Sequence, residues 1–376
     1  MTARGTTATS ISAGVLSIAL LGDALLYVVL PVNAAQFGIT LAWVGVLLSA
    51  NRIIRIFTYS QVVWLADTIG LKRISVVAAV GGAGSTLLYG LGEGGPVLLF
   101  ARIIWGLSFA AMSLTTLAYA VDDRKHAGAR VGLSRAILQI GPALSLTLGA
   151  WLAGILGAQS VFLVLGITSL AAIPLAFFLP AESKKPTPMQ RSWFPKPVRS
   201  DLLFFVVGFS VDGVFVMTIT LVFLETASVE VAMLSGGVLL ASHRLAEIIL
   251  APIGGAFGDK IGVWRLLNVS VIALAVGFAA IGSGAIYTGA GLIIMARSVI
   301  AAVGPAAIVE SVPPQNTMHR LAVMQTWRDF GSALGPLVSG FLYAGLGASI
   351  VYFGIVPMLL GMLILMVAPG RSVNVA

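Results

Sequence analysis

The sequence contains one charged segment twice, and this internal repeat constrains the fold more than any other feature. Residues 47–74 (LLSANRIIRIFTYSQVVWLADTIGLKRI) correspond to residues 239–266 (LLASHRLAEIILAPIGGAFGDKIGVWRL), which lie 192 positions further along the chain. Arg52 in the first copy aligns with Arg244 in the second, each within an otherwise apolar stretch. Two related halves that each carry an arginine into an apolar segment are typical of membrane transporters.

Composition indicates that lipid, rather than water, surrounds most of the chain. Hydrophobic residues make up 58% of the sequence and charged residues only 10%, whereas a soluble domain carries about 25% charged residues. The chain has no cysteine, which excludes disulfides, thiol catalysis and thiolate metal sites. The net charge of +8 does not predict nucleic-acid binding, because its solvent-facing part falls in loops on one side. The first apolar segment lacks a small-residue cleavage site, so we expect it to remain as a helix.

Apolar runs that can cross the hydrocarbon core, which takes about 20 residues each, occur in two sets of six. The first set covers residues 9–31, 41–66, 72–92, 96–119, 132–156 and 160–180. The second set covers residues 201–223, 232–257, 264–283, 287–310, 322–345 and 348–369. The sequence therefore predicts an all-α membrane protein with twelve transmembrane helices in two pseudo-symmetric six-helix bundles, residues 1–180 and 201–376. Residues 181–200, rich in proline, lysine and arginine, form the predicted linker.

Positive charges lie on one side of these predicted helices. That side holds the basic linker and Lys72, Arg73, Arg124, Lys125, Arg130, Lys260, Arg265, Arg320 and Arg371, whereas the opposite loops contain no lysine or arginine. Because loops rich in lysine and arginine stay in the cytoplasm, both termini and the linker are predicted to be cytoplasmic. The predicted location is the inner (cytoplasmic) membrane, crossed many times.

With these features the chain resembles the major facilitator superfamily over nearly its full length. The family's loop motif after the second helix is approximately G-x-L-A-D-R-x-G-R-K. The sequence contains its acidic residue, glycine and a basic residue twice, as Asp67, Gly70 and Arg73 and as Asp259, Gly262 and Arg265. The first copy departs from the motif at Val63 and Thr68, which replace a glycine and a basic residue.

Glycine at the second of these positions permits a sharp turn. A carboxylate at the membrane edge can accept hydrogen bonds from a neighbouring helix N-terminus. The resemblance implies that this contact is a latch, made in one conformation and broken in the other. A solvated turn charge is the alternative interpretation.

Two weaker matches lie in the fourth and fifth predicted helices. Arg102-Ile-Ile-Trp-Gly106 is similar to the family's R-x-x-q-G motif. Gly141-Pro142, followed by Gly149 and Gly154, resembles the glycine-rich motif of the drug/proton antiporter branch, although Leu144 and Ser145 stand where that branch has a glycine pair. A helix bend needed for packing explains the same residues.

Ionisable side chains inside membrane helices are costly and mark functional interiors. Counted from the external helix ends, Asp23 and Arg52 lie at similar depth in the first two helices, and Asp212 and Arg244 do so in the seventh and eighth. We therefore predict that Asp23 lies within ion-pair or single-water distance of Arg52, and Asp212 within the same distance of Arg244. Asp23 and Asp212 are the candidate proton-coupling residues, with Tyr27 one turn from Asp23. Purely structural salt bridges are the alternative.

A second set of charges is inverted between the halves. Arg55 in the second helix corresponds to Glu247 in the eighth, and aligned Gly-Pro pairs place Arg135 in the fifth helix opposite Asp329 in the eleventh. The family architecture packs the second helix against the eleventh and the fifth against the eighth. It therefore implies two gating contacts between the halves, Arg55 with Asp329 and Arg135 with Glu247. Snorkelling of Arg135, Arg328 and Asp329 into water is the alternative.

Basic residues within the predicted helices outnumber acidic ones. The arginines are Arg52, Arg55, Arg102, Arg135, Arg244, Arg297 and Arg328, against the acids Asp23, Asp212, Glu247 and Asp329. If these residues face a central cavity, the surplus favours a substrate that carries carboxylate or phosphate. Arg52, Arg244, Tyr27, Arg102, Arg297 and His243 are the candidate substrate-binding residues. His243 alone is equally explained as a polar contact between helices.

No metalloprotease motif, phosphate-binding loop or nucleophile elbow occurs in the sequence, and the loops are too short for an ATP-binding domain. We predict a secondary active transporter, not an enzyme, that exports a small amphiphilic or anionic solute by proton antiport with alternating access. Proton-coupled uptake by symport is the alternative, and a non-transporting receptor or scaffold is a third interpretation. The expected partners are a small-molecule substrate, protons and the lipid bilayer, with no nucleic acid, cofactor or metal, and the chain is expected to be a monomer.

Overall fold

A computed structural model describes residues 3–181, 194–225 and 228–367, and every regular element in these ranges is helical. The described elements form twelve long helices, of which ten are long and apolar enough to cross a membrane by length and composition. The other two are the second and the eleventh helices, which carry several of the predicted buried charges. The predicted fold class is thereby confirmed.

The first six helices follow the predicted apolar runs. They are α1 (Ala3–Val32), α2 (Leu41–Ile69), α3 (Leu71–Leu91), α4 (Gly95–Val121), α5 with α6 (Ala127–Leu144 and Ala150–Leu156), and α7 with α8 (Ala158–Ser169 and Ala172–Phe177). A π-helical turn, η3 (Ser145–Gly149), joins α5 to α6. Short 3₁₀ turns, η1 (Ala34–Phe37) and η2 (Arg124–His126), lie in the connecting loops.

The second six helices repeat this order. They are α9 with α10 (Arg199–Val207 and Val216–Leu224), α11 (Val229–Ile261), α12 (Val263–Gly282), α13 (Ile286–Glu310) and α14 (Thr317–Val367), which contains the last two spans. Gly347, at φ 75°, interrupts α14 between those spans, at the loop that the apolar runs predict. A π-helical segment, η4 (Gly208–Phe215), joins α9 to α10, and η5 (Pro314–Asn316) precedes α14.

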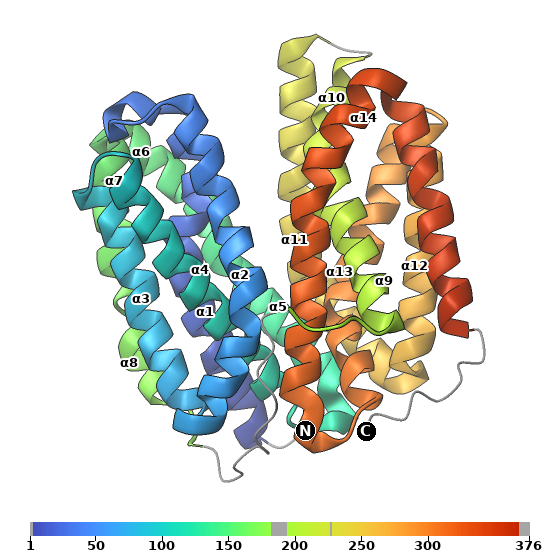
Figure 1. Cartoon of the computed structure of the whole chain (residues 1–376), viewed down its shortest axis with the longest axis horizontal. Coiled ribbons are helices and arrows are strands. Elements are labelled where there is room, and N and C mark those ends of the chain that lie inside the picture. The colour runs from blue at the N-terminus through green and yellow to red at the C-terminus, as the bar shows by residue number, and fades with distance from the viewer. Residues whose placement is uncertain (1–2, 182–193, 226–227, 368–376) are drawn as a thin grey trace.

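Figure 1 shows α1–α8 gathered in one bundle and α9–α14 in a second bundle beside it. The predicted linker, residues 181–200, lies largely outside the described residues, because residues 182–193 are not described. Its described end contacts α14, since Nε1 of Trp327 donates to the carbonyl of Pro195 at 3.1 Å. The exact boundaries of the two halves stay a prediction.

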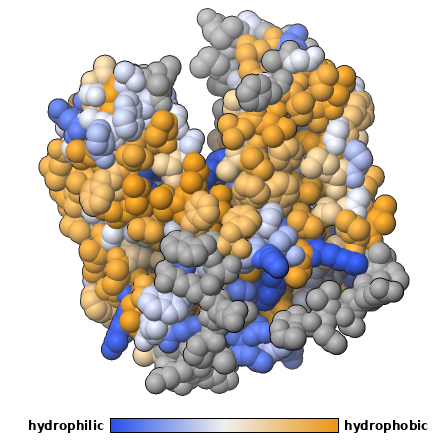
Figure 2. All heavy atoms as spheres, in the orientation of Figure 1, coloured by the Kyte–Doolittle hydropathy of each residue, from blue (hydrophilic) through white to orange (hydrophobic). Residues whose placement is uncertain are grey.

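The two bundles meet at one end and separate at the other. Figure 2 shows a hollow between them on the side away from the start of α1, with hydrophilic residues at its bottom and hydrophobic residues over the outer faces. On the opposite side, α5 packs against α11 and α2 against α14. We call these the open side and the closed side.

Glycines bring α5 and α11 into backbone contact on the closed side. A Cβ atom on Gly132 would collide with the carbonyl of Ala251, and one on Gly255 would collide with the carbonyl of Gly128. Small residues at a helix interface allow this approach in membrane proteins, where close packing drives association. The conformation is therefore one in which these two helices touch along their backbones.

Candidate functional site

Each half contains one ion pair between its first and fourth long helices. In the first half, Nη1 of Arg102 on α4 donates to Oδ1 of Asp23 on α1. In the second half, Nε and Nη2 of Arg297 on α13 donate to Oδ1 and Oδ2 of Asp212 at 3.0 and 3.1 Å. The two pairs occupy equivalent places in the repeat. The Asp23 and Asp212 side chains remain 13% and 21% exposed, so solvent can reach both carboxylates.

Neither aspartate forms an ion pair with its predicted partner, Arg52 or Arg244, in the described ranges. The helix face explains the difference, because Arg52 and Arg244 donate to acceptors in the opposite half of the molecule. Asp212 lies within the π-helical segment η4, and a π turn shifts the following side chains around the helix axis relative to regular α spacing.

Tyr27 lies beside the first-half pair, as its spacing from Asp23 predicts. Its hydroxyl accepts a 3.4 Å hydrogen bond from Nη2 of Arg102, and its ring centroid is 5.8 Å from the guanidinium carbon. Arg102 also donates from Nε to the carbonyl of Leu47 at 2.9 Å. The guanidinium of Arg102 is thus oriented by three acceptors: the Asp23 carboxylate, the Tyr27 hydroxyl and the Leu47 carbonyl.

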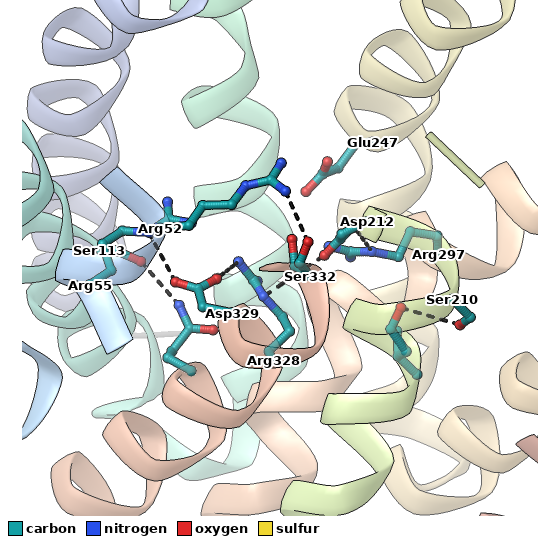
Figure 3. Close-up of polar contacts among 12 residues, drawn as sticks. Arg52, Arg55, Ser113, Ser210, Asp212, Glu247, Arg297, Arg328, Asp329 and Ser332 are labelled. Carbon is teal, nitrogen blue, oxygen red and sulfur yellow. Dashed lines mark hydrogen bonds and ion pairs between the residues drawn. The ribbon is translucent and has the colours of Figure 1, made fainter. Parts of the chain in front are cut away.

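Arg52 and Arg244, the pair aligned by the repeat, each cross to the other half and meet a neutral acceptor. Nη1 of Arg52 on α2 donates to the carbonyl of Ser332 on α14 at 2.9 Å, as Figure 3 shows. Nη1 of Arg244 on α11 donates to Oε1 of Gln139 on α5 at 3.0 Å. Neither guanidinium forms an ion pair with a carboxylate in the described ranges. A guanidinium has five N–H donors, so both can bind a further acceptor.

The predicted contact between Arg55 and Asp329 is confirmed. Nε of Arg55 on α2 lies 3.0 Å from Oδ2 of Asp329 on α14, and the Asp329 side chain is only 1% exposed (Figure 3). Such burial excludes snorkelling as the explanation for Asp329. Tyr59 was missed from the sequence, although it lies one turn after Arg55: its hydroxyl donates to the same Oδ2 at 2.8 Å. Nη2 of Arg328 approaches Oδ1 at 3.4 Å.

The predicted ion pair between Arg135 and Glu247 is not formed. Oε2 of Glu247 instead accepts a 2.6 Å hydrogen bond from Nε2 of Gln139 and lies 3.9 Å from Nε2 of His243. Gln139 lies one turn after Arg135 on α5, so the helices were paired correctly but the partner residue was not. Gln139 on α5 therefore bonds to both Glu247 and Arg244 on α11, and so joins the two halves.

The motif carboxylate of the second half makes the predicted contact with a helix N-terminus. Oδ1 and Oδ2 of Asp259, at the end of α11, accept hydrogen bonds from the backbone N–H groups of Gly128 and Ala129, each at 2.8 Å. These are the first amides of α5, where the helix dipole favours a negative charge. Beside them, the hydrogen bond between Asp123 and His126 lowers the pKa of the Asp123 carboxyl.

The first-half copy of the motif differs. Gly70 and Gly262 both have positive φ, at 86° and 104°, as the predicted turns require. Oδ1 of Asp67, however, is buried without a hydrogen-bond partner in the described part of the chain. Arg73 and Arg265 are exposed. Only one of the two repeat-related latches is therefore formed in this conformation.

The position of Arg130 in the structure contradicts the prediction that it lies in a solvent-facing loop. It lies in the first turn of α5 and is 2% exposed. Its Nη2 donates to the carbonyl of Gly5 at 2.8 Å and also to that of Tyr119, near the C-terminal end of α4. Helix C-termini attract positive charge, which explains the burial of this arginine.

A comparison with protein families identifies a match over most of the chain. The family model described as the Major Facilitator Superfamily matches residues 13–295. The match is to the superfamily as a whole, so the resemblance to its drug/proton antiporter branch stays a prediction. No curated protein sequence matches the chain.

Solved structures share the fold. The human organic anion transporter MFSD10 (TETRAN) superimposes with a TM-score of 0.77 at 17% sequence identity, covering 97% of this chain and 100% of that one. The proton:xylose symporter XylE bound to 6-bromo-6-deoxy-D-glucose gives 0.73 at 15% identity, covering 97% and 94%. At these identities the likeness shows the fold alone.

Proposed function

Because the chain belongs to the major facilitator superfamily, and is therefore a multi-pass secondary active transporter and not an enzyme, we propose that it carries a small organic anion together with a proton. The observation that supports an anionic substrate is the pair of repeat-related arginines, Arg52 and Arg244. Each reaches across the gap between the halves to a neutral acceptor and keeps donors free for a carboxylate or phosphate. One of the two fold relatives is an organic anion transporter by its name.

Binding of an anion at these arginines would also change the contacts between the two halves. A ligand that contacts Arg52 on α2 and Arg244 on α11 replaces the bonds to Ser332 and Gln139, which join the halves. The bound substrate would then contact both halves and take the place of their direct hydrogen bonds. A ligand shifts a conformational equilibrium only by such differences in interaction between states.

Charge linkage favours symport over the antiport expected from the sequence. An anion bound near Asp23, Asp212 and Glu247 repels their negative charges and so favours binding of a proton to one of them. Linkage is reciprocal, so a bound proton strengthens binding of the anion by the same factor. Proton and anion therefore bind together and move together. Export by antiport would instead require a substrate that competes with the proton, as an amphiphilic cation does.

The test is flux in proteoliposomes made with the full chain. Counterflow with labelled dicarboxylates, aromatic carboxylates, phosphate esters and organic cations identifies the charge class of the substrate. We expect Arg52→Gln and Arg244→Gln to lower anion flux by about tenfold or more, the effect of losing a charge-assisted hydrogen bond. Lys260→Gln, an exposed charge on the same helix as Arg244, is the matched control and should leave flux unchanged.

A pH-sensitive dye inside the liposomes distinguishes the coupling modes. Symport predicts that adding substrate outside acidifies the lumen, whereas antiport predicts that it makes the lumen alkaline. Flux of cations without flux of anions would contradict the proposed substrate class, and alkalinisation during anion uptake would contradict the proposed coupling.

A further inference from the structure

A small cavity lies between the halves on their closed side. Its polar lining consists of Arg135 on α5, Arg297 on α13, and Gln325 and Arg328 on α14, and the remaining lining residues are apolar. Its volume of about 20 Å³ exceeds the roughly 10–15 Å³ that one water needs, which leaves room for a slightly larger ion. Close to this cavity, Nε2 of Gln325 donates to Oγ of Ser113 on α4 at 3.2 Å, so the halves are in contact here.

The charges around the cavity do not balance. Three guanidinium groups line it, and none of the lining residues is acidic. Arg297 and Arg328 share Asp212, with Nε of Arg328 at 3.9 Å from its carboxylate. Nη2 of Arg328 also lies 3.4 Å from Asp329, a carboxylate that Arg55 shares. Arg135 forms no ion pair in the described ranges, and Nε of Arg135 and Nε of Arg328 are both buried without a hydrogen-bond partner. Buried like charges repel one another, and a buried donor without an acceptor is destabilising.

We propose that this cavity binds one small monovalent inorganic anion of the size of chloride, between Arg135 and Arg328. Such an ion supplies the missing negative charge and accepts hydrogen bonds from the unpartnered guanidinium N–H groups. Neither Arg52 nor Arg244 lines the cavity, so this site is distinct from the Arg52–Arg244 site of the proposed function.

The anion site also depends on conformation. Arg135 belongs to the first half, and Arg297 and Arg328 belong to the second, so the three guanidinium groups come together only when the closed side is closed. An ion bound among them stabilises that state by its differential affinity. The anion thus regulates the transport cycle and need not be transported itself.

Thermal unfolding of the purified full chain tests the proposal. Chloride replaces methanesulfonate, which is too large for the cavity, at fixed pH and ionic strength. We expect a saturable rise in Tm with chloride concentration for the wild type. Arg135→Gln should raise the half-saturating chloride concentration by about tenfold or more. Arg124→Gln is the matched control, because Arg124 also bridges the halves, bonding to Thr317 at 3.1 Å, but lies outside the cavity.

Three results would overturn the proposal: equal Tm values in both salts, an unchanged chloride response in Arg135→Gln, or competitive loss of the chloride response when the transported organic anion is added. The last result would assign the cavity to the substrate. If Arg135→Gln does not fold, Arg135→Lys retains the charge and should show a weaker but measurable chloride response. Counterflow measured in methanesulfonate reports the proposed function independently of this site.

Discussion

Asp23 and Asp212 each bind an arginine from the fourth long helix of their own half, and both carboxylates stay partly exposed. A proton that binds either carboxylate removes the negative end of an ion pair and leaves a buried guanidinium to find another acceptor. An arriving substrate anion is one such acceptor. These two residues are thus suited to connect protonation with substrate binding within each half.

We expect Asp23→Asn to abolish proton-driven accumulation in proteoliposomes while sparing counterflow. The amide oxygen of asparagine can still accept a hydrogen bond from Arg102, but the side chain can no longer bind and release a proton. Asp122→Asn, an exposed site on the closed side, serves as the control. Accumulation in the Asp23 variant that equals wild type would mean that the ion pair is structural.

The buried contact between Arg55 and Asp329 should hold the closed side shut. Replacing one partner leaves the other without its main counter-charge, at a cost of about 3–5 kcal/mol when it stays buried. We expect Arg55→Glu to favour opening of this side, and Arg55→Glu with Asp329→Arg to restore part of the balance. Restoration should be partial, because Tyr59 and Arg328 also bind Asp329.

Thiol labelling of Ser113→Cys reports this opening, because Ser113 is 7% exposed and bonds across the halves. Labelling rates of the two single variants and the double variant form a double-mutant cycle. If the two substitutions add without coupling, the contact does not control the gate.

At the scale of elements, the α5–α11 interface is the tightest contact between the halves. Its glycines let the two backbones touch, and the Asp259 latch binds the first amides of α5 at the same interface. The α2–α14 interface on the other edge carries the Arg55–Asp329 pair but no second latch. The two edges of the closed side are thus held by different means.

We expect Gly132→Ala to bias the protein toward opening of the closed side. Its new Cβ atom would collide with the Ala251 carbonyl, and overpacking of this kind costs about 1–3 kcal/mol. That cost changes a population ratio by about 5- to 150-fold. Labelling of Ser113→Cys should therefore accelerate. Gly154→Ala, in the same span but with nothing near the added atom, should not change it, and equal rates in both variants would refute the role of this contact.

The sequence predicted the helices better than it predicted which side chains contact one another. Apolar runs mark the helices because the bilayer requires a fixed length of apolar chain, and the repeat marks which helices correspond. Partners depend on the face that each side chain occupies, and π-helical turns such as η4 change that face without an obvious sequence signal. Neutral partners such as Gln139 and Tyr59 were not predicted, because a pattern of charges in apolar helices does not mark neutral side chains. Both lie four residues after a predicted gating arginine, which is the spacing of adjacent positions on one helix face.

At the scale of the whole molecule, sidedness is the prediction that relates this conformation to the cell. If both termini are cytoplasmic, the open hollow faces outward. We expect a membrane-impermeant maleimide to label Ser160→Cys in intact cells and Lys125→Cys only after permeabilisation. Both residues are exposed. Ser160 lies in the first turn of α7 and Lys125 in η2, which follow the fifth and the fourth helices and so lie on opposite sides in the predicted topology, and the chain has no competing cysteine. Equal labelling of both in intact cells would contradict the predicted topology.

The unequal latches have a consequence for the order in which the closed side comes apart. Asp259 is bonded to two amides of α5, whereas Oδ1 of its counterpart Asp67 has no hydrogen-bond partner in the described ranges. An interface that is held more strongly at one edge separates first at the other edge. We therefore expect water to enter between α2 and α14, to wet Arg55 and Asp329 early, and to reach Gln139 and Glu247 last. The closed side would then open from its α2–α14 edge toward its α5–α11 edge, although the repeat that builds the two edges is nearly symmetric.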